Sequence, residues 1–187
     1  MVAVEDPNPQ VAGRGIAALR AAGIEAELGE GAEQVEADLA GFLMRMRRGY
    51  GRITLKIAMS LDGRTAMPSG ESQWITGEDA RADVQRLRAE SDLMVTGVGT
   101  VLADDCRLTL RADELPLDAD AKGRALAHPP ARMVLDSKGR TPAGARILEG
   151  GQTTVITTEN IALSELAQKA VLSADTKGRV DISAWVE

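Results

Sequence analysis

The sequence predicts an α/β fold with a mostly parallel sheet flanked by helices. Two observations lead to this prediction. Short apolar segments typical of strands occur at 53–59, 93–96, 132–135 and 153–157, and helical patterns occur between and after them, at 78–90 and 163–171. Strands that alternate with helices return to the same edge of a sheet, so parallel pairing is expected.

Composition restricts the classes of function. The 187 residues are 44% hydrophobic, which is enough for a packed core, and the net charge of −6 argues against nucleic acid or an anionic membrane as a general partner. The single cysteine, Cys106, and the single histidine, His128, exclude an internal disulfide and any zinc-site spacing. No apolar run reaches the roughly 18 residues of a membrane span, and the first residues lack signal-peptide features, so a cytoplasmic location is expected.

The first 49 residues are expected to form a small βαβα unit. Strands are predicted at 2–4 and 24–28, with helices at 11–22 and 32–48. The second helix ends in three arginines that match its dipole, which favours a solvated helix end over a nucleic-acid patch. The glycines around Tyr50 mark the expected boundary, so residues 1–49 and 50–187 are predicted to be separate domains.

The remaining elements follow in the second domain. A helix cap is expected at Thr76, and another helical turn at Thr100. The polar, Asp-rich segment 112–130 is expected to be a long surface loop, and a last short strand is predicted at 180–182.

Few side chains indicate chemistry by themselves. The turn 97–100 (Gly-Val-Gly-Thr) follows a strand and is typical of phosphate binding, but it matches neither the Rossmann fingerprint nor a P-loop, and a purely structural turn is the alternative. Lys56 interrupts an apolar strand, so it either reaches solvent or points into a cleft. Trp74 either packs in the core or covers a planar ring. These residues allow a nucleotide-type binding site on an α/β sheet, and by themselves they indicate no more than that.

Three longer motifs carry a family resemblance. LKIAMSLDGRTAMPSGESQWITG at 55–77, ARADVQRLR at 80–88 and TGVGTVLADDCRLTLR at 96–111 together resemble the reductase domain of the bifunctional riboflavin biosynthesis deaminase/reductase. The run RMVLDSKGRTP at 132–142 also fits, and DPNPQVAGRGIAALRAAGIEAE at 6–27 resembles the end of the deaminase domain. The resemblance covers nearly the whole chain in order.

The resemblance implies a fold, a reaction and a site. The fold is similar to dihydrofolate reductase, the reaction is the NADPH-dependent reduction of the ribosyl group of 5-amino-6-(5-phosphoribosylamino)uracil, and the assembly is a homodimer through the reductase domain. The implied cofactor-binding residues are Ala58, Trp74, Thr100, Asp104 and Ser137. The implied substrate-binding residues are Lys56, Ser72, Arg88, Leu108 and Arg111. Lys56 and Asp104 are the implied catalytic residues, and Lys56 would donate a hydrogen bond or proton near the sugar oxygen that gains charge.

Departures from the family pattern lead to further expectations. The deaminase motifs His-Ala-Glu and Pro-Cys-x-x-Cys are absent, so neither zinc nor deaminase activity is expected. A later acidic residue and glycine-rich cofactor loop are absent as well, so the chain resembles an internal piece whose isolated activity is weak or nil. Cys106 stands where the family has proline. An inactive fragment that binds a partner chain, or another enzyme with a dihydrofolate-reductase-like fold, remain alternatives.

Overall fold

The computed structural model describes residues 1–187 except 73, 164, 166 and 184–187. The chain divides into two compact units, one that contains Met1–Lys56 and one that begins at Ile57.

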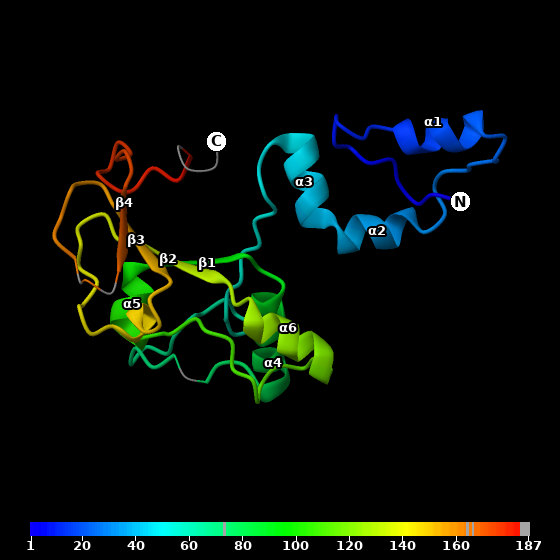
Figure 1. Ribbon diagram of the computed structural model, residues 1–187. Coiled ribbons are helices and arrows are strands. Elements are labelled where there is room, and N and C mark those ends of the chain that lie inside the picture. Colours follow the sequence, from blue (N-terminus) through cyan, green and yellow to red (C-terminus); the bar gives the residue numbers. More distant parts are fainter. Residues whose placement is uncertain (73, 164, 166, 184–187) are drawn as a thin grey trace. The chain divides into compact units, whose positions relative to one another are not determined.

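The first unit is mainly helical (Figure 1). Its helices are α1 (Arg14–Ala21), α2 (Ala32–Asp38) and α3 (Ala40–Arg48). Where two strands were expected, Val2 and Leu28 form a single parallel bridge.

The predicted helix at 32–48 is interrupted at Leu39, where φ is −102°. An ion pair accompanies this break, in which the Arg47 guanidinium lies 2.6 Å from the Glu36 carboxylate. Residues eleven positions apart are about 16 Å apart along a straight helix, so this contact requires the chain to fold back at Leu39.

A parallel four-stranded sheet, in the order β1-β2-β3-β4, forms the centre of the second unit (Figure 1). The strands are β1 (Leu93–Gly97), β2 (Ala131–Leu135), β3 (Thr153–Thr157) and β4 (Gln168–Val171). Each strand pairs in parallel with its neighbour, and Gly97 lies opposite Leu135 at the carboxyl ends of β1 and β2. The predicted parallel α/β sheet is confirmed.

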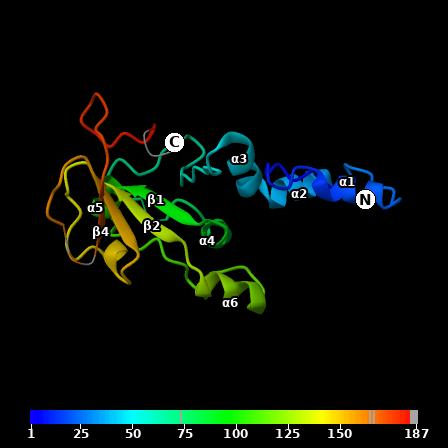
Figure 2. The ribbon, with the colours of Figure 1, turned by 45° about the horizontal axis from the view of Figure 1, so that its top comes forward.

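Helical segments accompany this sheet. They are α4 (Glu78–Ala89), α5 (Val98–Asp104), α6 (Ala119–Ala127) and the 3₁₀ turn η1 (Arg146–Leu148). Of these, α5 and η1 pack against the sheet. Figures 1 and 2 both place α4 and α6 away from β4, on the side of β1 and β2.

Alternation along the strands divides the core between the two faces of the sheet. Val134 and Val155 pack on one face with Val98 and Val101 of α5 and with η1. Met133 and Ile156 point to the other face, where they pack with Val180. Val134 and Val155 are fully buried, so the sheet is covered on the face that also holds α5.

The predicted strand at 53–59 does not form. These residues carry no helix or strand assignment, and the alternating apolar side chains of Ile53 and Leu55 are 72% and 82% exposed. A strand needs a neighbour for its backbone hydrogen bonds, and within the described residues no strand pairs with this segment.

Two further predictions in the second unit are wrong. The segment 163–171 contains strand β4 instead of a helix, because its short apolar run fits either structure and the free edge of β3 supplies the hydrogen bonds. The expected loop at 112–130 contains α6, which begins where the Asp118 carboxylate accepts a hydrogen bond of 2.8 Å from the backbone N–H of Ala121. Asp118 is a strong N-cap signal that precedes an alanine-rich run.

A buried carboxylate organises the turn after β2. Asp136 is fully buried, and its Oδ2 accepts hydrogen bonds from the backbone N–H and the Oγ1 hydroxyl of Thr141, at 2.6 and 2.7 Å. Burial alone would raise the pKa of Asp136, but hydrogen bonds from the backbone of Arg140 and from Thr141 bring it below its ordinary value of 3.8.

We predict that Asp136→Asn lowers the free energy of unfolding by about 1–3 kcal/mol at pH 7, because a neutral amide forms weaker hydrogen bonds with Thr141 and its N–H group would lie at the Oδ1 position, which is buried without a partner among the described residues. A carboxylate with a lowered pKa stabilises the fold fully above its unfolded value and loses this effect as the pH falls below about 3.8. The difference between wild type and variant should therefore shrink below that pH. Urea titrations at several pH values measure it, and a difference that persists at acid pH would contradict the assignment.

Candidate functional site

Two of the predicted cofactor residues lie at one edge of the sheet. Thr100 follows β1 in α5, and Ser137 follows β2 by two residues. Because Gly97 pairs with Leu135, both side chains come directly after the carboxyl ends of neighbouring parallel strands. This edge is where open α/β sheets bind ligands. Thr100 and Asp104 are exposed on α5, so their polar atoms face solvent.

Ser137 is held firmly at this edge. Its Oγ accepts a hydrogen bond of 2.9 Å from the backbone N–H of Val180, and its carbonyl oxygen accepts one of 2.9 Å from the Thr158 hydroxyl. The hydroxyl hydrogen of Ser137 remains a donor for another group.

A second group of predicted residues meets on the segment 105–111, which we call the arginine loop. The Arg88 guanidinium reaches from α4 and donates a hydrogen bond of 3.0 Å to the carbonyl oxygen of Thr109. The backbone N–H of Arg111 donates to Oε1 of Gln85 at 3.1 Å, and the Arg111 side chain pairs with Glu114 at 2.7 Å. The structure thus brings Arg88, Leu108 and Arg111 together.

The electrostatics of this group favour a negative partner. Burial lowers the pKa of Arg88, and the positive charge of Arg111 lowers it further. The Nε atom of Arg88 is also buried without a hydrogen-bond partner among the described residues. The positive charges of Arg88 and Arg111 suit a phosphate, which would compete with Glu114 for the Arg111 guanidinium.

The backbone of the arginine loop is strained at two positions. Asp105 has φ of 41° and Leu108 has φ of 55°, and such left-handed conformations cost non-glycine residues about 1–3 kcal/mol each. Contacts hold both residues in place, because Asp105 Oδ1 accepts a hydrogen bond from the backbone N–H of Arg146 and Leu108 packs against the core beside Cys106.

The remaining predicted residues lie apart from these two groups. Within the described part of the chain, no hydrogen bond or ion pair joins them to either group. Ala58 and Ser72 are half-buried in the segment 57–77, which forms turns without a helix or strand in its described part. Trp74 is 67% exposed, and the Arg81 guanidinium lies 4.7 Å from the centre of its ring. Lys56 is exposed and belongs to the first unit, whereas the others belong to the second.

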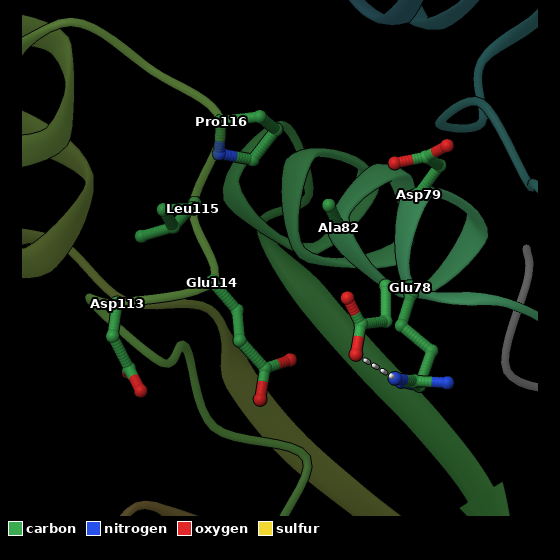
Figure 3. Close-up of a pocket in the computed structure, with 8 residues that line it drawn as sticks. Glu78, Asp79, Ala82, Asp113, Glu114, Leu115 and Pro116 are labelled. Atoms are coloured by element: carbon green, nitrogen blue, oxygen red, sulfur yellow. Dashed lines mark ion pairs between the residues drawn. The ribbon is translucent and has the colours of Figure 1, made fainter.

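An acidic cleft of about 440 Å³ lies between α4 and the segment that follows the arginine loop (Figure 3). It is lined by Glu78, Asp79, Arg81, Ala82, Asp113, Glu114, Leu115 and Pro116. None of the predicted site residues lines this cleft, although Arg81 contacts Trp74 and Glu114 pairs with Arg111. Four carboxylates against one guanidinium do not suit a phosphate, so the cleft borders the candidate site without being its anion site.

Two features of the described residues bear on the class of site. No three histidine, cysteine or acidic side chains lie in positions to hold a metal ion among them. None of the helices within that part of the chain is long and apolar enough to cross a membrane.

The family model for the RibD C-terminal domain matches residues 52–187. The chain belongs to this family. The match includes both the sheet edge at Thr100 and Ser137 and the arginine loop, so each group of site residues lies inside the RibD C-terminal domain.

Named relatives agree with this assignment. The riboflavin biosynthesis protein RibD of Haemophilus influenzae is 51% identical over 142 residues, which cover 75% of this chain and 38% of that protein. The structure of Acinetobacter baumannii RibD in form 1 matches with a TM-score of 0.77 and 42% identity, over 94% of this chain and 49% of that one.

A third relative carries a more explicit name. The Thermotoga maritima structure of a diaminohydroxyphosphoribosylaminopyrimidine deaminase/5-amino-6-(5-phosphoribosylamino)uracil reductase matches with a TM-score of 0.80 and 29% identity, over 99% of this chain and 48% of that one. The chain therefore spans about half the length, or less, of these relatives. The predicted family and its fold are confirmed.

Sequence reasoning missed two residues of the RibD C-terminal domain that position others. Gln85 is the buried residue of α4, and Asp136 supports the turn that carries Ser137. The sequence did contain an indication for Gln85, because it is the one uncharged polar side chain in the highly charged run ARADVQRLR. For Asp136, the pattern Asp-Ser-Lys-Gly is typical of a turn but does not indicate that the carboxylate is buried.

We predict that Cys106 reacts slowly with alkylating reagents at pH 7. Burial raises the pKa of this thiol above 9.0, and the neighbouring Asp104 raises it further, which leaves little thiolate. The rate constant for iodoacetamide should be about tenfold lower in the native chain than in the chain unfolded in urea. Equal rate constants would contradict the burial of the thiol.

Proposed function

We propose that the chain is the reductase domain of a riboflavin biosynthesis enzyme and reduces the ribosyl group of 5-amino-6-(5-phosphoribosylamino)uracil with NADPH. The observation that carries the proposal is the pair of neighbouring arginines, Arg88 and Arg111, which lie within a matched RibD C-terminal domain. Their positive charge suits the phosphate of this substrate.

The sheet edge fits the cofactor. Thr100 and Ser137 offer hydroxyl groups at the carboxyl ends of β1 and β2, and a Cβ atom added to Gly97 or Gly99 would meet nothing within 4 Å. Open space and hydroxyl donors are what a ribose or phosphate of a dinucleotide requires. We assign Ala58, Trp74, Thr100, Asp104 and Ser137 to the cofactor. When bound, NADPH supplies the hydride.

The chemistry requires a proton as well as a hydride. Reduction of the ribosyl group forms a C–H bond at the anomeric carbon and breaks the ring C–O bond, so the ring oxygen must receive a proton. Lys56 is the proposed donor, because an ammonium group supplies a proton and also stabilises the developing negative charge. Ser72, Arg88, Leu108 and Arg111 are the proposed contacts for the substrate, and Asp104 is assigned to the reacting centre.

We extend the proposal to organisation and assembly. Residues 1–49 are assigned to the end of a deaminase domain and residues 50–187 to the reductase domain. The proposal includes a homodimer through the reductase domain and a cytoplasmic location. None of the described helices is long and apolar enough to span a membrane.

We predict that the chain oxidises NADPH only when 5-amino-6-(5-phosphoribosylamino)uracil is present. Loss of NADPH absorbance measures the rate, and chromatography of the product should find the ribityl compound. In Lys56→Ala the rate should fall by about 10²–10⁴-fold, because a positioned proton donor has been removed, while NADPH still binds.

The control for this assay is the same substrate without its phosphate, which should react poorly with wild type. A chain that binds neither NADPH nor the phosphorylated substrate in calorimetry would contradict the proposed function and favour a non-catalytic role.

We predict that Arg111→Ala raises KM for the phosphorylated substrate by about 10–100-fold and changes kcat little, because the phosphate is remote from the reacting carbon. Arg86→Ala is the matched control. Arg86 is on α4, the helix that contacts the arginine loop, but its guanidinium pairs with Asp83 and Glu90 on the exposed surface. Equal effects of the two substitutions on KM would exclude a phosphate site at the arginine loop.

A further inference from the structure

Gln85 is a polar residue in an apolar position. It lies in the middle of α4, its side chain is fully buried, and it is the buried residue of that helix. The helix around it is strongly charged and exposes Asp83 and Glu90. A methionine or leucine would fill this position without burying polar atoms.

The orientation of the Gln85 amide follows from its partner. The backbone N–H of Arg111 can only donate, so the atom that faces it at 3.1 Å must be the oxygen Oε1. The nitrogen Nε2 then faces the other way, and it is buried without a hydrogen-bond partner among the described residues. Gln85 thus makes one good hydrogen bond and leaves one buried donor unsatisfied, which is unfavourable for stability.

The hydrogen bond that Gln85 makes is not needed to satisfy Arg111. The Arg111 side chain is 43% exposed and the bond from its backbone N–H is only partly buried, so this donor lies close to solvent if Gln85 is replaced. What the bond does is fix the position of the Arg111 backbone relative to α4. The stability of the fold therefore does not explain a glutamine at position 85. The placement of the Arg111 backbone does explain it.

Arg88 holds the same loop from the same helix. It lies three positions after Gln85, so both side chains leave α4 on one face. Arg88 bonds to the carbonyl oxygen of Thr109, and Gln85 bonds to the N–H of Arg111. Between Asp105 and Arg111 the loop contains two left-handed residues, so it needs such contacts to keep one shape.

We propose that Gln85 is a positioning residue for the phosphate site: its Oε1 fixes the backbone of Arg111 so that the Arg111 guanidinium stays beside that of Arg88. This inference rests on the proposed function in that it takes the arginine loop as the binding place of the substrate phosphate.

The test substitutes Gln85→Met, which keeps the length of the side chain and the helix propensity but removes the acceptor. The dissociation constant of a pentose 5-phosphate, measured by calorimetry without cofactor, should rise about tenfold. KM for the full substrate should rise by the same factor with kcat within about twofold, and the thermal midpoint should stay equal or increase because the unsatisfied donor is gone.

A double-mutant cycle makes the test specific. If Gln85 acts through Arg111, adding Gln85→Met to Arg111→Ala should weaken binding of the pentose phosphate no further. Ser91→Ala is the matched control, because it removes a hydrogen bond from the end of α4, to the carbonyl oxygen of Leu87, without touching the arginine loop. The control should leave the dissociation constant unchanged.

Several results would overturn the proposal. They are unchanged binding in Gln85→Met, additive losses in the cycle, a thermal midpoint that falls together with affinity, or a wild-type chain that binds no pentose phosphate. A wild-type chain that binds the sugar phosphate in a Gln85-dependent way but reduces no substrate would support the positioning role and contradict the proposed function alone.

Discussion

The parallel pairing of β1 with β2 is the constraint on which the sheet edge of the candidate site depends. Its register places Gly97 opposite Leu135, so the two strands end together and the chain segments that follow them start from one edge. Thr100 and Ser137 are brought to this edge by strand register alone, although they are 37 positions apart in the sequence. A shift of one residue would turn the side chains of β2 to the opposite faces and separate Val134 from the core of α5.

The arginine loop depends on a different kind of contact. Its residues belong to no helix or strand, and hydrogen bonds from α4 and from the 3₁₀ turn η1 define its shape. The strain at Asp105 and Leu108 is balanced by the burial of Leu108 and Cys106 against the sheet. The site therefore combines a rigid edge set by backbone pairing with a loop that is held by side chains.

The sequence predicted the parts of this arrangement that follow from local patterns. The strands at 132–135 and 153–157 were predicted closely because continuous apolar runs bounded by turn residues are typical of buried parallel strands. The predictions at 53–59 and 163–171 depended on which neighbour each segment would find, and apolar periodicity does not contain that information. Gln85 was missed for the same reason, because its importance comes from a hydrogen bond to a residue 26 positions away.

The stacking of Trp74 on Arg81 limits how a flat molecule can approach this part of the chain. An indole has two faces, and a guanidinium group already covers one of them at 4.7 Å. An incoming aromatic ring can stack only on the open face of Trp74 unless it first displaces Arg81. The positive charge of Arg81 on the opposite face draws electron density away from the indole ring. Electron-rich rings are therefore better suited than electron-poor ones, and the side from which they arrive is already determined before any ligand is present.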